Sequence, residues 1–331
     1  MKKILSNGIK VAVSLIISAA VLYLVYKDYD FSEFRKGVSD IKVGWLIAAL
    51  AFSIVGPLLR GMRWNLLLDP VGCRVPERDA ILTVFTGYAA NIIIPRIGEI
   101  SRCAILESKN KVPFSKSFGT LVAERFIDFI LLLLITVSTV CIQSGMFVDL
   151  FSGKANISGN VEAVQSEAVS DAGASHLWLW IAAAALLAIL WIIGRKFNLR
   201  KRIVDFAKGF WEGFIALKDV QHLPLFIIYS IGIWVCYYLE MYLAFFCIDS
   251  IAGVGAMAGL VCFVSGSIAV LVPTPNGAGP WHFAITSMLV LYGVSLTDAQ
   301  TFALVLHTAQ TATYLLAGAL AWVALQMVKR S

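Results

Sequence analysis

The sequence is poor in charged residues: Asp, Glu, Lys and Arg make up only 15% of its 331 residues. Soluble proteins average about 25%, so the shortage excludes a chain whose whole surface faces water. In place of charge, 59% of the residues are apolar, and several apolar runs exceed the roughly 18 residues that indicate a membrane-spanning helix. The composition therefore predicts an all-α membrane protein rather than soluble domains.

The sequence also lacks the motifs of several common sites. Its six cysteines show no C-x-x-C spacing, which argues against a zinc site or a disulfide framework. No Walker loop, dinucleotide fingerprint, metal-ligand helix or nucleophile elbow is present. We therefore expect no metal, no cofactor and no catalytic residue, and we do not expect an enzyme.

Lys and Arg are unevenly distributed, and their distribution predicts the orientation. They gather near both termini and at 60–78, 96–116 and 195–218, whereas 142–176 contains only Lys154 and 249–298 contains none. Cytoplasmic loops carry such an excess of positive charge. Both termini are therefore predicted to be cytoplasmic, in an inner-membrane protein with an uncleaved first span. The same bias explains the net charge of +6 without nucleic-acid binding.

Two of the apolar segments, 81–95 and 252–294, are interrupted by Pro and Gly. The loops on both sides of the first are basic, and those around the second are not. Each segment is therefore predicted to be a hairpin that returns to its own side, either re-entrant or crossing twice, and the two open to opposite faces. About six further runs are predicted to cross fully: 11–26, 44–59, 117–141, 177–194, 223–247 and 302–328.

The order of these segments predicts one integral-membrane domain over 1–331, built from half-repeats at about 1–142 and 177–331. Because the two halves would run in opposite directions, the plan is that of an inverted-topology repeat, common in secondary transporters. The polar segment 143–176 is expected to be a flexible external loop. Regularly spaced Phe residues in 199–217 indicate either an amphipathic helix on the cytoplasmic surface or a solvated connector.

Three groups of residues within the apolar segments are candidates for a site. In the first, Pro95 is expected to end a helix and Gly98 to let the chain turn. Arg96, Glu99 and Arg102 follow at spacings of three, so a helix over 97–106 would place them on one face. Their surplus positive charge suits a phosphate, since Arg offers a planar fork. An interfacial salt-bridge cluster is the structural alternative.

The second group, Glu124, Arg125 and Asp128, lies inside an apolar span. Each charge near the bilayer centre costs about 2.5–3.5 kcal/mol on insertion scales, so partners are expected. Arg125 is predicted to pair with Asp128, and the group is predicted to meet Arg96 or Arg102. A structural ion network remains the alternative to a functional site.

The third group is a run rich in Pro and Gly that is expected to break a helix and to expose backbone amides to an anion. Its helix breaks are Pro273, Pro275 and Pro280, and its binding residues are Asn276, Gly277, Gly279 and His282. Outside the three groups, Arg60 and Arg63 are interpreted as positive-inside anchors. Glu240, in the middle of a span, has an open role, structural or functional.

Together these motifs resemble the flippase-like transmembrane domain of lysylphosphatidylglycerol synthases. The resemblance spans nearly the whole chain and implies a stand-alone member without the C-terminal synthase domain. The third motif departs from the pattern P-x-P-G-G-x-G-x-x-E, because Asn276 replaces a Gly and His282 replaces the acid.

The resemblance implies a lipid translocase or lipid-binding transporter that handles anionic or modified phospholipids, with a membrane phospholipid and a separate lipid-modifying enzyme as expected partners. One alternative is an enzyme or enzyme subunit that modifies a lipid-linked substrate at the membrane surface. The other is a structural membrane scaffold.

Overall fold

The structure is a computed structural model that describes residues 2–29, 31–144 and 218–327, and within these ranges it contains helices and no strands. The helices are α1 Lys2–Tyr26, α2 Phe31–Ser39, α3 Val43–Leu68, α4 Glu77–Ile93, α5 Ile97–Asn110, α6 Phe114–Ile142, α11 Leu223–Phe245, α12 Asp249–Ala252, α13 Ala256–Ala269, η1 Pro275–Gly277, α14 Pro280–Leu291 and α15 Leu296–Met327. The prediction of an all-α membrane protein is confirmed. The span predicted at 177–194, the surface segment at 199–217 and most of the loop at 143–176 lie outside the described residues.

Four helices, α3, α6, α11 and α15, are long and apolar enough to cross a membrane. Each coincides with a predicted span, as does α1, so the protein is a multi-pass membrane protein. The observed α3 is longer than the predicted span 44–59, because it continues through Arg60 and Arg63 to Leu68. Both arginines are buried, so they do not mark the end of the apolar span as they would at a membrane surface.

The helices α3 and α11 pack against each other along their length and run in opposite directions. Their ends are joined where α3 begins and α11 finishes: the backbone N–H of Lys42 donates to the carbonyl of Cys247, 2.9 Å away. The side chain of Lys42 also forms an ion pair with Asp249. This antiparallel pair joins the two halves of the bundle, as does the packing of α4 against α15.

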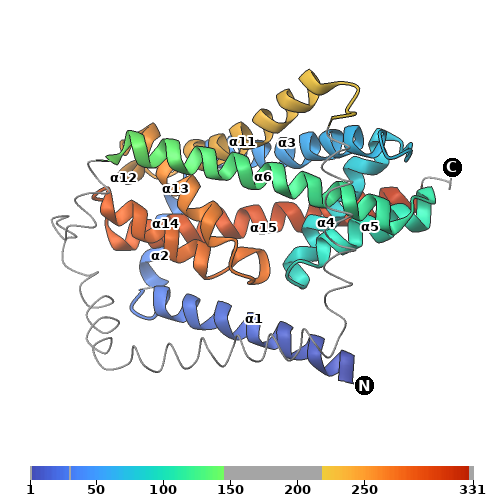
Figure 1. Ribbon diagram of the computed structural model, residues 1–331. Coiled ribbons are helices and arrows are strands. Elements are labelled where there is room, and N and C mark those ends of the chain that lie inside the picture. Colours follow the sequence, from blue (N-terminus) through green and yellow to red (C-terminus); the bar gives the residue numbers. More distant parts are fainter. Residues whose placement is uncertain (1, 30, 145–217, 328–331) are drawn as a thin grey trace, which may run out of the picture.

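Two helical hairpins fill the remaining interior (Figure 1). The first hairpin, α4 and α5, follows the end of α3, and the second hairpin, α13 and α14, follows the end of α11. Because α3 and α11 are antiparallel, the open ends of the hairpins lie at opposite ends of the bundle. The arms of the first hairpin have 17 and 14 residues, and those of the second have 14 and 12. At 1.5 Å per residue, the arms are roughly 18–26 Å long.

The first hairpin differs from its predicted bounds, 81–95. Its returning arm is α5, which the charge distribution had assigned to a cytoplasmic loop. The reason is that Arg102 and Lys109 on α5 are buried by partners, so these charges do not require water. Lys109 donates to the carbonyl of Leu325 at 3.0 Å and lies 3.3 Å from an oxygen of Asp79.

The turn of the first hairpin is made by Arg96, not by Gly98 as predicted. Ile94 is extended, as expected before proline, and Arg96 has a positive φ of 62°. Gly98 lies inside α5, where it is buried against α4. A Cβ atom at Gly98 would overlap the carbonyl oxygen of Gly87, so this glycine allows the two arms to approach closely.

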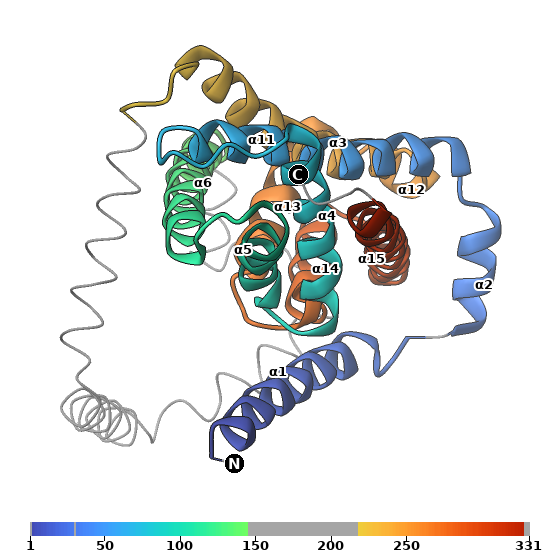
Figure 2. The ribbon, with the colours of Figure 1, turned by 90° about the vertical axis from the view of Figure 1, so that its right-hand side faces the viewer.

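The second hairpin turns through a loop between α13 and α14 that contains η1. Asn276, Gly277 and Gly279 have φ values of 49°, 75° and 94°. Pro280 is the first residue of α14 and therefore starts that helix rather than breaking one. Helix α1 lies against this loop (Figure 2), where Ser14 and Ser18 donate to two of its carbonyl oxygens at 2.6 and 2.8 Å.

Candidate functional site

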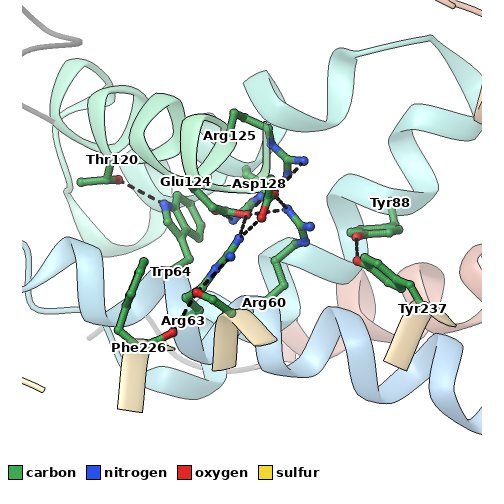
Figure 3. Close-up of polar contacts among 12 residues, drawn as sticks. Arg60, Arg63, Trp64, Tyr88, Thr120, Glu124, Arg125, Asp128, Phe226 and Tyr237 are labelled. Carbon is green, nitrogen blue, oxygen red and sulfur yellow. Dashed lines mark hydrogen bonds and ion pairs between the residues drawn. The ribbon is translucent and has the colours of Figure 1, made fainter. Parts of the chain in front are cut away.

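Six charged side chains from three helices meet in the interior (Figure 3). We call them the arginine–carboxylate cluster: Arg60 and Arg63 from α3, Arg102 from α5, and Glu124, Arg125 and Asp128 from α6. Glu124 and Asp128 lie one helical turn apart, so both point to the same neighbours. The cluster joins the first hairpin to two of the long helices.

Each carboxylate of the cluster accepts from more than one arginine. Arg60 reaches Glu124 at 2.8 Å and Asp128 at 2.7 Å, whereas Arg63 reaches Asp128 at 2.7 Å. Arg102 donates to the second oxygen of Glu124 at 3.0 Å. Arg125 lies 3.6 Å from Asp128. This last contact is an ion pair, whereas the contacts of 2.7–3.0 Å are charge-assisted hydrogen bonds, the strong class.

The cluster is buried and carries more positive than negative charge. The carboxylate of Glu124 is fully buried, and Arg60, Arg63 and Arg102 are nearly so. Four arginines against two carboxylates leave a surplus of two positive charges. Isolated charges are costly away from water, so the cluster favours the approach of an anion.

An aromatic side chain supports the buried end of the cluster. The guanidinium of Arg102 stacks on the ring of Trp64, 4.1 Å from its centroid. The indole N–H of Trp64 donates to the hydroxyl of Thr120 at 3.1 Å. Arg102 is thus held from both sides, by Trp64 and by Glu124, and its role here is to hold the cluster together.

A cavity of about 450 Å³ begins where the cluster ends. Arg60, Arg125 and Asp128 form its charged wall. Aromatic side chains form much of the rest: Tyr88, Trp234, Tyr237, Phe263, Trp281 and Tyr314. Ligand sites of roughly 300–1,000 Å³ usually combine such apolar walls with a few polar groups.

The cavity reaches the outer flank of the protein. Three residues of its lining are exposed: Phe129 on α6, and Val270 and Leu271 after α13, with exposed fractions of 57%, 48% and 54%. Phe129 lies near the middle of α6. These three exposed residues are apolar, and Phe129 places them beside the middle of the length of α6.

The far wall of the cavity is polar and belongs to the second half of the chain. His307 bonds through Nε2 to the carbonyl oxygen of Asn276 at 3.0 Å, and the Asn276 amide donates to Thr311 at 2.8 Å. The ring of His282 lies 4.4 Å from that of His307. Gln310 donates to Glu240 at 2.7 Å. These contacts connect the loop of the second hairpin to α15 and α11.

Three of the ten predicted binding residues, Arg125, Asp128 and Asn276, line the cavity. Glu124 and Arg102 lie behind its charged wall, and they pair with each other as predicted. Arg96 is exposed at the apex of the first hairpin, where it donates to Leu271 instead of reaching the cluster. Glu99 is half-buried beside that apex, and Gly277, Gly279 and His282 lie in or beside the second apex.

Three of the backbone amides in the predicted anion pocket at the second apex donate within the turn itself. The amide of Gly277 donates to the carbonyl of Thr274, and that of Ala278 to Pro275. The amide of Gly279 donates to Nδ1 of His282 at 3.4 Å. The turn itself uses these donors, so the positive charge of the site comes from arginine side chains.

The interpretation of Arg60 and Arg63 as surface anchors was wrong, because both are buried in the cluster. The sequence contained evidence for their burial. The two arginines are spaced i,i+3, which places both on one face of a helix, and the carboxylates Glu124 and Asp128 inside a later span required partners. The aromatic lining of the cavity had no comparable signal. It comes from α4, α11, α13, α14 and α15, which are brought together only by folding.

Comparison with known proteins places the chain in a family. A glycosyltransferase of Haloferax volcanii, AglD, is 25% identical over 129 residues, which make up 38% of this chain and 20% of that protein. The chain thus matches about a fifth of the length of this relative. The family described as the lysylphosphatidylglycerol synthase TM region matches residues 11–318, nearly the whole sequence. The protein therefore belongs to the family of the lysylphosphatidylglycerol synthase transmembrane region.

Proposed function

We propose that the protein binds the anionic headgroup of a membrane phospholipid in the central cavity and moves that lipid between leaflets. One observation carries the proposal: a buried cluster with surplus positive charge forms the wall of a cavity that is otherwise largely aromatic. Arg60 and Arg125 are the cationic groups of the cluster that face this space. A guanidinium presents the planar fork that matches a phosphate.

The opening of the cavity suits the rest of a lipid. With the phosphate against Arg60 and Arg125, the acyl chains would leave between Phe129 and Leu271, which are exposed and apolar. A small water-soluble anion would gain nothing from that apolar opening. The geometry therefore favours a lipid over a free phosphate.

The hairpins supply a route from both sides of the membrane. Their arms are shorter than the about 30 Å of a bilayer core, and we propose that they are re-entrant. They enter from opposite ends and meet at their apices, as in inverted-repeat transporters with a site near the midplane. We place both termini in the cytoplasm of an inner-membrane protein. The first hairpin then opens inward and the second outward.

Leaflet exchange of a labelled anionic phospholipid in liposomes tests the proposal. Arg125→Gln is the sharpest variant, because Arg125 lines the cavity and is the most exposed arginine of the cluster. Loss of a hydrogen bond to a charged group costs about 1.5–3 kcal/mol, so exchange should slow roughly 10- to 100-fold. Arg74→Gln is the matched control, since Arg74 is exposed outside the site. Equal exchange rates for Arg125→Gln and the wild type would refute the proposal.

The similarity to part of a glycosyltransferase favours a second candidate, in which the protein is an enzyme or an enzyme subunit that modifies a lipid-linked substrate at the membrane surface. Purified protein that converts such a lipid without any partner would favour this reading. A scaffold without a lipid site is a third reading. It requires that Arg125→Gln and the wild type co-purify with the same lipids, which mass spectrometry of gently purified protein would reveal.

A further inference from the structure

Glu240 lies in the interior of the same cavity and, among the residues that the structure describes, has no cationic partner. It lies on α11, a long apolar helix, and its exposed fraction is 4%. Its hydrogen-bond partner is the neutral amide of Gln310, at 2.7 Å. Within the described ranges no Lys, Arg or His forms an ion pair with it, whereas Glu124 and Asp128 share four arginines.

The surroundings of Glu240 do not compensate a negative charge. Helix α3 contributes Arg60, which is bonded to Glu124 and Asp128. On α4 and on α11 itself, the hydroxyl groups of Tyr88 and Tyr237 bond to each other at 2.6 Å. Three other titratable groups lie nearby: Cys236, one turn earlier on α11, and Tyr314 and His307 on α15. Of these, His307 bonds through Nε2 to the carbonyl oxygen of Asn276. Helix α13 lines the cavity with Phe263, Gly266 and Ser267, which carry no charge.

An isolated carboxylate away from water is costly, and it avoids this cost by binding a proton. Water that enters an empty cavity lowers the cost and allows the proton to leave. We propose that Glu240 is a proton-binding site linked to the lipid site, so that the protein binds an anionic headgroup and a proton together. This inference rests on the proposed function, since the headgroup is the ligand that changes the charge of the cavity.

The coupling follows from the shared space. Arg60, Arg125 and Glu240 all line one cavity of about 450 Å³. Such a volume is roughly 10 Å across if it is nearly spherical, which is within the screening length of about 8–10 Å in salt solution. An anion at the arginines therefore repels a carboxylate at Glu240 and favours its protonated form. By linkage, protonation of Glu240 favours anion binding by the same factor.

Calorimetry tests this coupling directly. Short-chain phosphatidylglycerol is titrated into the purified full-length protein in buffers that differ in ionisation enthalpy. The difference in heat reports the protons taken up per lipid bound. The wild type should take up a proton from the buffer, to at most one per lipid. Glu240→Gln should bind the lipid without uptake, since its amide can still bond to Gln310.

Two further variants complete the test. Glu240→Asp keeps a carboxyl group and should keep the uptake, whereas Glu77→Gln, an exposed Glu outside the cavity, should behave as the wild type. Uptake that persists in Glu240→Gln would overturn the inference. Lipid binding by the wild type without any proton uptake would overturn it too and leave the lipid site standing. Absence of lipid binding by the folded wild type would overturn both.

Discussion

The guanidinium of Arg96 donates a hydrogen bond to the backbone carbonyl of Leu271, 2.8 Å away. Arg96 lies at the apex of the first hairpin and Leu271 in the loop of the second, 175 residues later. The apices of two hairpins that enter from opposite ends of the bundle are therefore in direct contact. The same loop forms part of the opening of the cavity, so the contact between the apices lies beside the access to the site.

Cross-linking of the two apices should block exchange between leaflets. Arg96→Cys and Leu271→Cys, joined by a short bifunctional reagent, would hold the hairpins together, and the rate of lipid exchange in liposomes should fall at least about tenfold if apex separation gates access. Lys42→Cys with Asp249→Cys is the matched control, because these exposed residues join α3 to the segment after α11 away from the cavity. Similar rates for the cross-linked and reduced apex pair would contradict the gating role.

Asp128→Asn should strongly destabilise the protein. Removing one partner of a buried ion pair typically costs about 3–5 kcal/mol, because the remaining charge is left uncompensated. Here Arg60 and Arg63 both lose their short contacts to Asp128. Thermal denaturation in detergent measures the change. Asp249→Asn is the control, since an exposed pair contributes about 0–1 kcal/mol, and an equal loss in both variants would argue against the cluster's structural role.

Gly98→Ala should destabilise the first hairpin by about 1–3 kcal/mol, the usual cost of overpacking a well-packed interior. The added methyl group would overlap the carbonyl oxygen of Gly87 on the facing arm. Gly44→Ala is the control for replacing a helical glycine by alanine without overpacking, because a Cβ atom at Gly44 meets no atom within 4 Å. Denaturation midpoints of the two variants should therefore differ. If Gly98→Ala is as stable as the wild type, the arms are not as closely packed as described.

Cysteine labelling in intact cells should show opposite accessibility for the open ends of the two hairpins. Ser108, near the end of α5, should be reached by a membrane-impermeant reagent only from the cytoplasm, and Ser295, after α14, only from outside. Both are exposed, whereas five of the six native cysteines are buried. Replacing Cys141, the exposed one, removes the background. Labelling of Ser108→Cys from outside would contradict the orientation.

The apolar spans and the helix breaks could be predicted from the sequence, because each depends on a local pattern. Proline removes a backbone donor, and long apolar runs are stable as helices in lipid. The pairing of Arg102 with Glu124 was also predictable, since a buried charge demands a partner. The extent of the first hairpin could not be predicted from the sequence. Counting charges assigned α5 to a loop, and only its packing shows that Arg102 and Lys109 need no water.

The sequence by itself determined that this protein lies in a membrane, where its helices break, and which charges had to be buried. The tertiary structure alone decided which arginines complete the cluster and which of them face the cavity. Arg60 and Arg102 have the same chemistry, but Arg60 lines the cavity while Arg102 is stacked on Trp64. The same holds for carboxylates: within the described part of the chain, Glu124 pairs with several arginines and Glu240 pairs with none. The physical reason is that a charge is compensated in three dimensions by residues from other helices, and spacing along one helix does not identify them.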